Sequence, residues 1–496
     1  MVQLFGHVER PVNVCQSGRV ASASADFDVI IVGAGLSGIG MAHHLQRLCP
    51  WARYAILEAR GAIGGTWDLF RYPGIRSDSD MHTLGYSFRP WRDGMAIADG
   101  DKIKAYIEDT AKEAGVERHI RFGVRVERAS WSSSDALWTA ETKDGSLTCR
   151  VLVMCAGYYS YEEGHRPSWE GEEDFAGRIV HPQFWPKDLD WRGKRVAVIG
   201  SGATAVTLIP ALAREAAHVT MVQRSPSYVA ARPSHDRIAA GLKRLLPLKA
   251  SAGLTRWKNV LVQQFFFRMA RRRPERVKAK LVQLVEKEVG AEQARHFTPT
   301  YNPWDQRLCL APDGDLFAAI RAGKASVATA EIERFTPDGL RLGNDTEVPA
   351  DIVVTATGLK VQLAGGIALV KDGEPVRLAD TIAYKGVMFS DLPNFASIFG
   401  YTNASWTLKA DLSAAFLCRL LNRMRRRGEK VVVARRDLTV GERPFLDFTS
   451  GYVRRALDQM PRQGDRGPWR LKQSYTADLM NLRYGRVDDG VLHFSQ

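Results

Sequence analysis

Three glycines near the start of the chain stand at the spacing of a phosphate-binding turn. Gly33, Gly35 and Gly38 form a G-x-G-x-x-G pattern. The first glycine permits a tight turn, the second lets a pyrophosphate approach the backbone, and the third allows a helix to pack closely on a strand. Glu58 follows 20 residues after Gly38, where a carboxylate can bind a ribose diol. The pattern with its spaced acid favours a bound dinucleotide over an ordinary glycine-rich turn.

A second cluster of small residues repeats this spacing 167 residues further on. It consists of Gly200, Gly202 and Ala205. The position of the spaced acid is here Gln223, followed by Arg224 and Ser225. A carboxylate would repel a 2′-phosphate, whereas an arginine attracts it. We therefore predict that the second site prefers NADPH to NADH, with Arg224 and Ser225 at the phosphate; the alternative is a surface arginine with no ligand.

Short apolar runs on both sides of each turn predict buried parallel strands, and a helical pattern follows each turn. The runs are residues 28–32 and 54–57 around the first turn, and 195–199 and 218–222 around the second. Residues 151–157 and 351–358 have the same strand-like shape. The turns are too far apart to share one βαβ pair. The pattern therefore predicts an α/β fold with two Rossmann-like dinucleotide-binding domains.

The order of these units predicts that the first domain is discontinuous. We expect it to comprise residues 26–185 and 350–496, with the second dinucleotide-binding domain, residues 190–349, inserted between its halves. Residues 1–25 lack the apolar segment of a secretory signal, so we expect a flexible leader.

Bulk properties exclude several classes of protein. No run of about 18 apolar residues is present, so no transmembrane helix is expected. The six cysteines are scattered and form neither C-x-x-C nor a zinc spacing. This argues against a disulfide framework, a dithiol redox pair and a bound metal. These features predict a cytoplasmic protein with reduced thiols.

The net charge of +14 is concentrated in one region. Residues 237–300 contain 15 Lys or Arg against 4 Glu and no Asp. Apolar residues accompany these cations on both sides of Pro274, which predicts a basic insert of two amphipathic helices broken at that proline. A helical hairpin over the substrate entrance is the simplest role, and peripheral contact with an anionic membrane is the second interpretation. No recognition motif accompanies the charge, so nucleic acid is not an expected partner.

The segment before the second turn carries the most specific motif. Residues 175–186, FAGRIVHPQFWP, fit F-x-G-x-x-x-H-x-x-x-W-P at every specified position. The specified residues are Phe175, Gly177, His181, Trp185 and Pro186. The motif resembles the fingerprint of type I Baeyer–Villiger monooxygenases, within the flavin-containing monooxygenase family. The resemblance implies an interdomain hinge whose histidine responds to NADP; a Pro/Trp-rich linker packed between domains is the plainer interpretation.

Further segments resemble the same family over residues 26–495. Its flavin-side loop is matched by Gly64–Trp67, which includes Gly65, Thr66 and Trp67, and by residues 71–78. Residues 305–309 look like the segment with the active-site arginine, here Arg307, and Thr357 and Gly358 look like the domain-linking motif. With residues 400–406 added, the pattern is similar to the mycobacterial ethionamide-activating monooxygenases. The resemblance implies FAD in the first domain and NADPH in the second.

The resemblance also implies a reaction. NADPH would reduce FAD, the reduced flavin would capture O2 as a C4a-peroxide, and a small lipophilic ketone would become an ester or lactone, with sulfides as further substrates. Arg307 would stabilise developing negative charge, because a guanidinium stays protonated, and Asp78 would orient it. From the residues alone, with 229 positions between them, a structural ion pair would be the simpler interpretation.

Two alternatives stay open at this point. An S- or N-oxygenase would use the same cofactors, and a nucleotide-binding module would keep both folds without turnover. One departure from the family concerns Gln306, where many members that oxidise cyclic ketones have a lysine that helps to hold the 2′-phosphate. This leaves Arg224 and Ser225 with more of that task.

Overall fold

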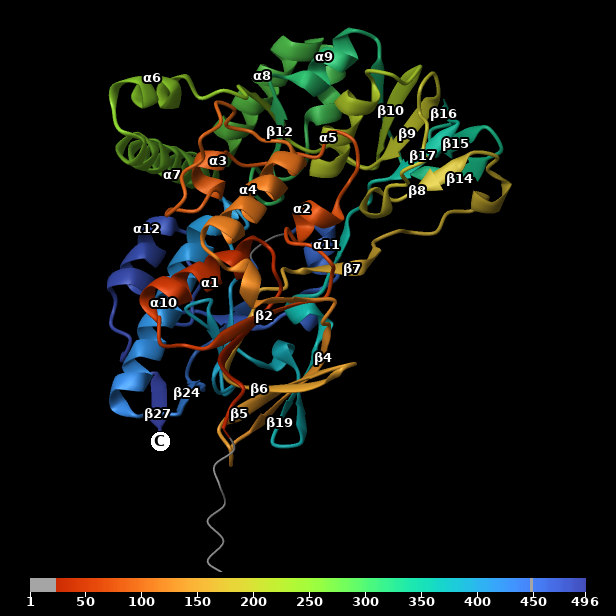
Figure 1. Ribbon diagram of the computed structural model, residues 1–496. Helices are drawn as coiled ribbons and strands as arrows, with labels where there is room; N and C mark the ends of the chain where they lie inside the picture. Colours follow the sequence, from red (N-terminus) through yellow and green to blue (C-terminus); the bar gives the residue numbers. More distant parts are fainter. Residues whose placement is uncertain (1–23, 447–448) are drawn as a thin grey trace, which may run out of the picture.

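The computed structural model describes residues 24–446 and 449–496. The chain forms two lobes, each built on a β-sheet with flanking helices (Figure 1). The expected flexible leader, residues 1–25, lies outside the described residues except for Ser24 and Ala25. Ala25 is buried, and its carbonyl accepts a hydrogen bond from the guanidinium of Arg53 at 2.8 Å.

The larger sheet has nine strands and is built around the first dinucleotide unit. β1 (Phe27–Val32) pairs in parallel with β2 (Tyr54–Glu58) and β6 (Gly145–Met154). The other strands are β3 (Ile120–Phe122), β4 (Val126–Ser132), β5 (Leu137–Thr142), β19 (Ala368–Lys371), β20 (Glu374–Val376) and β23 (Phe395–Ser397). The chain leaves this sheet after β6 and returns to it at β19.

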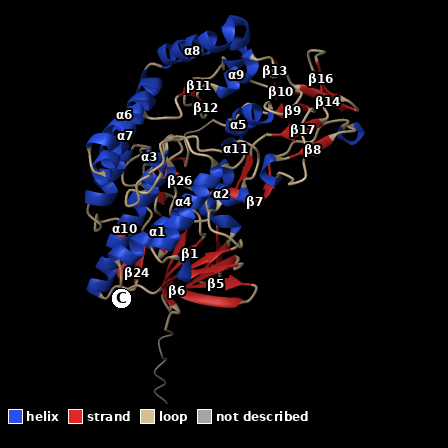
Figure 2. Cartoon of the chain, turned by 45° about the horizontal axis from the view of Figure 1, so that its top comes forward, coloured by secondary structure: helices blue, strands red, loops and turns tan. Residues whose placement is uncertain are grey.

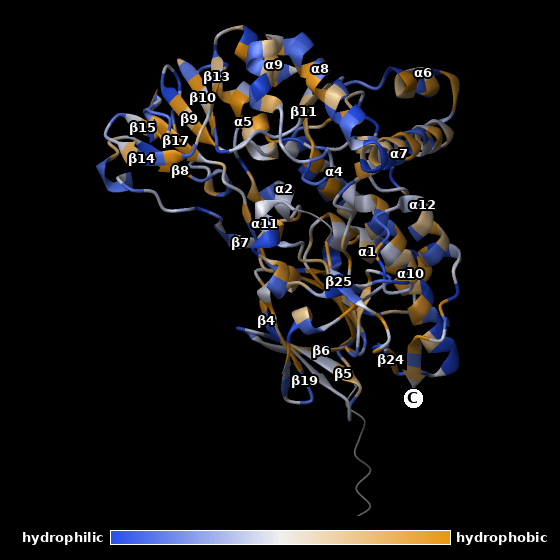
Figure 3. Cartoon of the chain, turned by 180° about the vertical axis from the view of Figure 1, so that it is seen from behind, coloured by the Kyte–Doolittle hydropathy of each residue, from blue (hydrophilic) through white to orange (hydrophobic). Residues whose placement is uncertain are grey.

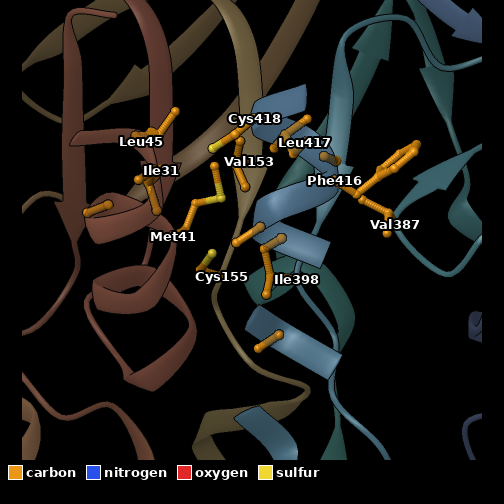
Figure 4. Close-up of a cluster of buried hydrophobic side chains, with 14 of the residues drawn as sticks. Ile31, Met41, Leu45, Val153, Cys155, Val387, Ile398, Phe416, Leu417 and Cys418 are labelled. Atoms are coloured by element: carbon orange, nitrogen blue, oxygen red, sulfur yellow. The ribbon is translucent and has the colours of Figure 1, made fainter. Parts of the chain in front are cut away.

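The larger sheet is buried on both faces at its strand β1. Successive residues of a strand point to opposite faces. Ile31 contacts a cluster that includes Met41 of α1 (Leu36–Leu48) and Phe416 of α10 (Trp406–Arg427) (Figure 4). Its neighbour Ile30 belongs to a separate cluster on the other face. Burial on both faces explains why the strand has a continuous apolar run instead of an alternating one.

The second sheet has five parallel strands in the order β13-β10-β9-β17-β8. These are β8 (Arg178–Val180), β9 (Arg195–Ile199), β10 (His218–Gln223), β13 (Ala325–Thr329) and β17 (Ile352–Thr355). The structure corrects the expected domain boundaries here, because β8 and β17 come from the ranges 26–185 and 350–496 that were assigned to the first domain. β17 lies between β9 and β8, and the pairing of all three in register places them in the second sheet.

Two antiparallel strands connect the lobes, β7 (Tyr159–Gly164) and β18 (Leu359–Val361) (Figure 1). β7 leads into the second lobe, and β18 leads back from it. Beside them, the hydroxyl of Thr357 donates to the carbonyl of His165 at 2.5 Å. The amide of His165 donates to the carbonyl of Gly358 at 3.1 Å. The two crossings are therefore hydrogen-bonded to each other.

The basic insert forms three helices, one more than the sequence predicted. They are α6 (Arg237–Leu245), α7 (Leu248–Arg272) and α8 (Pro274–Ala294). The predicted break at Pro274 is confirmed, because this proline occupies the first turn of α8, where its missing N–H costs nothing. α7 packs on α3 (Met81–Leu84) of the first lobe, whereas α8 contacts β11 (Val229–Arg232) and α9 (Asp315–Arg321) of the second (Figure 2). The insert therefore contacts both lobes.

Shorter elements complete the structure. The remaining helices and strands are α2 (Thr66–Leu69), α4 (Gly100–Glu113), α5 (Ala203–Leu212), α11 (Gly451–Arg454), α12 (Tyr475–Asp478), β12 (Cys309–Pro312), β14 (Ile332–Thr336), β15 (Gly339–Leu342), β16 (Glu347–Pro349), β21 (Ala383–Tyr384), β22 (Met388–Phe389), β24 (Val431–Ala434), β25 (Glu442–Pro444), β26 (Arg462–Gly464) and β27 (Leu492–Ser495). No helix in the described parts of the chain is long and apolar enough to span a bilayer.

Candidate active site

The first glycine turn joins β1 to α1. Gly33 has φ +104°, and an added Cβ there would lie 2.7 Å from the carbonyl oxygen of Cys155. An added Cβ at Gly38 would come within 1.9 Å of the Gly33 carbonyl oxygen. Gly35 faces Gly65, whose Cα would be 3.6 Å from an added Cβ. Gly35 and Gly65 thus face each other across a space that is lined by backbone atoms without side chains. This space at the N-terminus of α1 fits a pyrophosphate.

Glu58 ends β2 beside this turn. Its carboxylate accepts hydrogen bonds from the amides of Ala34 at 2.7 Å and Arg60 at 2.8 Å. The residue is 5% exposed, and burial raises the pKa of its carboxyl despite the lowering effect of the two amides. A buried acceptor held next to the turn fits the hydroxyls of a ribose.

The residues that follow Gly65 form α2. Gly65 has φ +57°, a left-handed conformation in which a side chain is strained. The hydroxyl of Thr66 lies 3.5 Å from that of Tyr161. Trp67 packs against the core cluster around α1. Gly65 and Thr66 therefore lie at the first turn, and Trp67 has a packing contact.

The second glycine turn joins β9 to α5 and repeats this geometry. Gly200 has φ +131°, and an added Cβ would lie 2.3 Å from the carbonyl oxygen of Ala356. No described atom would lie within 4 Å of an added Cβ at Gly202. Ala205, at the third position, is fully buried. The open space at the N-terminus of α5 fits a second pyrophosphate.

The residues at the end of β10 have separate surroundings. The side-chain amide of Gln223 is buried and donates to the hydroxyl of Thr329 at 2.8 Å. Arg224 and Ser225 are exposed, and Arg224 forms no ion pair with any residue that the structure describes. The hydroxyl of Ser201 donates to the carbonyl of Ser225 at 3.2 Å, which holds this segment beside the turn. An exposed, uncompensated guanidinium at this place fits a 2′-phosphate.

The structure brings Asp78 and Arg307 together as an ion pair. Their side chains are 38% and 33% exposed, so the pair lies at the border of the interior. Burial lowers the pKa of Arg307, but the charge of Asp78 outweighs this effect, and the pKa lies above its ordinary value. Arg307 is therefore a permanent cation at this site.

The loop of residues 71–78 reaches from the first lobe to the second. At Gly74 an added Cβ would lie 2.7 Å from the Cβ of Ala211 on α5. The guanidinium of Arg76 donates to the carboxylate of Asp315 on α9 at 2.5 Å. The ion pair between Asp78 and Arg307, which precedes β12, is the third contact of this loop with the second lobe. The pair is therefore located where the two lobes meet.

Three tyrosines that the sequence did not assign surround this ion pair. They are Tyr158, Tyr159 and Tyr452. Burial raises the pKa of each phenol, so all three remain neutral near pH 7. Tyr158 and Tyr159 directly follow the small residues that end the apolar run at 151–157. A pair of aromatic residues at the carboxyl end of a nucleotide-sheet strand was the available signal.

A tryptophan links these tyrosines to the first turn. Trp406 stacks on Tyr158 with ring centroids 5.3 Å apart and planes 8° from parallel. Its indole N–H donates to the hydroxyl of Ser37 at 2.7 Å. Ser37 lies inside the first glycine motif, so a continuous set of contacts connects that motif with the catalytic candidate Arg307.

His181 of the fingerprint lies against the crossing strands. Its Nδ1 accepts a hydrogen bond from the amide of Gln183 at 3.2 Å. An added Cβ at Gly164 would lie 2.0 Å from the imidazole, so the ring occupies the space that this glycine leaves. Burial lowers the pKa of His181, which keeps the ring neutral near pH 7. Its Nε2 is buried with no hydrogen-bond partner among the described residues, a group that a ligand or a hinge movement can engage.

The other fingerprint residues have packing contacts. Phe175 belongs to a core cluster of the second sheet. An added Cβ at Gly177 would lie 2.3 Å from the carbonyl oxygen of Asp351. Trp185 packs against the cluster around α5, and Pro186 follows it half-buried. The structure thus gives these residues a fixed place beside the interlobe connection.

Comparison with known proteins defines the fold class. Residues 30–243 match the family described as pyridine nucleotide-disulphide oxidoreductase. The structure of OTEMO in complex with FAD and NADP has a TM-score of 0.74 and 20% identity over 95% of this chain and 100% of that one. The oxidised steroid monooxygenase bound to NADP has a TM-score of 0.74 and 21% identity over 95% and 99%. The prediction of two Rossmann-like domains is confirmed.

Closer relatives define the family. The FAD-containing monooxygenase EthA of Mycobacterium tuberculosis is 53% identical over 477 residues, which are 95% of this chain and 98% of that protein. EthA of Mycolicibacterium smegmatis is 50% identical over 478 residues, 95% and 97% of the two chains. The chain belongs to the family of FAD-containing monooxygenases. The predicted class of enzyme, a flavoprotein monooxygenase, is confirmed, and a nucleotide-binding module without turnover is not supported.

Proposed function

We propose that the protein catalyses the Baeyer–Villiger oxidation of lipophilic ketones to esters or lactones and also oxidises sulfides. Ketone, O2, NADPH and a proton would give ester, NADP⁺ and water. The observation that carries the proposal is the Asp78–Arg307 ion pair, which lies where the flavin-side loop meets the second lobe. The two solved structures bound to NADP support NADPH as the reductant.

The two turns hold the cofactors in this proposal. FAD would be held by Gly33, Gly35, Gly38, Glu58, Gly65 and Thr66, and NADPH by Gly200, Gly202, Ala205, Arg224 and Ser225. When bound, FAD supplies the chemistry that neither side chains nor backbone can provide, the activation of O2 after reduction by NADPH. The protein must bind both nucleotides, hold the substrate and stabilise charge.

Arg307 stabilises the negative charge that develops on oxygen during the reaction. Its guanidinium stays protonated and offers several donors in a fixed plane. Asp78 orients the guanidinium and keeps the pocket from being purely cationic. The neutral phenols of Tyr158, Tyr159 and Tyr452, which lie half-buried around the arginine, would limit access of water to it.

The fingerprint acts as the hinge between the lobes. Thr357 and Gly358 belong to the hydrogen-bonded crossings, and His181 lies beside them with one free ring nitrogen. A change at the imidazole would therefore be transmitted to both crossings at once.

Product analysis tests the proposed function. The FAD-loaded enzyme would be supplied with NADPH, isotopically labelled O2 and a panel of aryl and long-chain ketones and sulfides, with products identified by mass spectrometry. We expect esters that carry one labelled oxygen, together with sulfoxides. Sulfoxides without any ester would overturn the proposal in favour of an S-oxygenase.

A further inference from the structure

Helices α6 and α7 leave an unusual number of large apolar side chains exposed to solvent. We call residues 237–274 the α6–α7 surface. Its exposed apolar residues include Ile238 (60% exposed), Leu245 (82%), Leu254 (53%), Trp257 (43%), Leu261 (54%) and Phe265 (61%). Figure 3 shows these two helices at the margin of the molecule with hydrophobic residues along them. Isolated exposed residues need no explanation, but six large exposed apolar side chains on two helices that pack together do.

Four of the exposed apolar residues of α7 lie in one row along the helix. Leu254, Trp257, Leu261 and Phe265 are spaced by three or four positions, which places them in one row. The opposite side faces the protein, and three of its five buried residues are polar, Ser251, Thr255 and Asn259. This is the reverse of an ordinary surface helix, whose apolar side faces the core.

The polar side of α7 is fixed to the first lobe. The amide of Asn259 donates to the carboxylate of Asp80 at 2.8 Å. The guanidinium of Arg256 donates to the carbonyl of Gly85 at 2.7 Å. These contacts hold the helix in one orientation, so its apolar side is directed outward by the fold itself.

The α6–α7 surface is also strongly basic. Residues 237–274 contain ten Lys or Arg and no Asp or Glu. Arg256, Lys258 and Arg271 have acidic partners, and Lys243 donates to backbone carbonyls. The other six are exposed and form no ion pair with any residue of the described ranges; they are Arg237, Arg244, Lys249, Arg268, Arg272 and Arg273.

We propose that the α6–α7 surface docks on an anionic lipid bilayer. Apolar residues that enter the acyl boundary and cations that reach phosphate headgroups are the two features of an interfacial helix. A second copy of the chain is a poor occupant, because a symmetric pairing sets the same surface against itself and would oppose six cations with six. Nucleic acid would satisfy the cations and leave the apolar row in water.

Vesicle co-sedimentation of the full-length, FAD-loaded protein tests the proposal. We expect binding to phosphatidylcholine vesicles that contain phosphatidylglycerol, weak binding to phosphatidylcholine alone, and weaker binding at high salt. Removing one cation near a membrane surface weakens binding about fivefold, so Arg268→Ser/Arg272→Ser should lose roughly 25-fold. The double variant Leu245→Ser/Phe265→Ser should abolish measurable binding.

Leu438→Ser is the matched control, because Leu438 is 87% exposed but lies outside the α6–α7 surface. It should bind vesicles as the unaltered protein does, and all variants should retain FAD and NADPH oxidation. Equal binding by the apolar variant and the control would overturn the proposal. So would a dimer, measured by analytical ultracentrifugation, that disappears in the apolar variant while vesicle binding is absent, or binding to duplex DNA that outcompetes vesicles.

Discussion

The two glycine turns have nearly the same backbone and opposite chemistry beside them. At the first turn, the strand that follows ends in the buried carboxylate Glu58, which accepts a hydrogen bond from Ala34 within the turn. At the second, the equivalent residue Gln223 is turned into the protein, and the exposed Arg224 comes next. The fold thus repeats the turn that we propose to bind pyrophosphate and varies the residue at the proposed ribose site.

Substitutions at the third position of each glycine motif should have the most different effects at the two turns. We expect Gly38→Ala to abolish retention of FAD, because its Cβ would lie 1.9 Å from the Gly33 carbonyl oxygen. Ala205→Gly should keep FAD and cost about 1 kcal/mol of stability, the usual penalty of a helical glycine. Absorbance of the flavin after gel filtration measures retention. FAD bound at full stoichiometry by Gly38→Ala would contradict the geometry.

The second-largest effect is expected at Arg307, the cation that lies where the two lobes meet. Arg307→Ala should lower the rate of ester formation by on the order of 10²–10³-fold, because a stabiliser of developing negative charge is lost. Reduction of FAD by NADPH should persist, since neither glycine turn is altered. Stopped-flow absorbance and product analysis separate the two steps. An unchanged rate of ester formation in this variant would remove Arg307 from the catalytic machinery.

Arg224 gives a smaller effect, confined to the second turn. Arg224→Ala should reduce kcat/KM for NADPH by about 10- to 100-fold, the value of a lost charge-assisted hydrogen bond, and leave kcat/KM for NADH nearly unchanged. Arg214→Ala is the control, since Arg214 is also exposed in the second lobe. If both variants behaved alike, the 2′-phosphate would be bound elsewhere.

The smallest effect concerns pH and the hinge. Burial lowers the pKa of His181 below its unfolded value of 6.5, so the unfolded chain binds a proton that the folded chain does not. This contribution to stability is present above pH 6.5 and is lost as the pH falls below it. His181→Gln should therefore show a smaller drop in Tm between neutral and mildly acidic pH. His493→Gln, at an exposed position, should follow the unaltered protein.

Local patterns were sufficient for the elements that hold the nucleotides. Glycine spacing and apolar runs predicted β1, β2, β9 and β10 because each of these features depends on neighbours within a few residues. The domain boundaries depend on which sheet a strand joins, and an apolar run such as Ile352–Thr355 fits either sheet equally well. Only the pairing of β17 with β9 decides between them.

The candidate site was likewise predictable only where a local motif marks its residues. Asp78 and Arg307 were predicted from motifs, although 229 positions separate them. The surrounding tyrosines were not, because Tyr452 and Tyr158 come from distant segments and meet only in the folded chain. The direction of the apolar row on α7 was left open between the substrate entrance and a membrane, since periodicity alone shows that a helix has an apolar side and not which way that side points.

The loop of residues 71–78 links the Asp78–Arg307 ion pair to the relative placement of the two lobes. Gly74, Arg76 and Asp78 each touch the second lobe, and all three belong to the first. A rotation about the paired connecting strands would strain these contacts together and draw the carboxylate away from its arginine. The charged pair is therefore held by the same loop that joins the two lobes in the arrangement seen here.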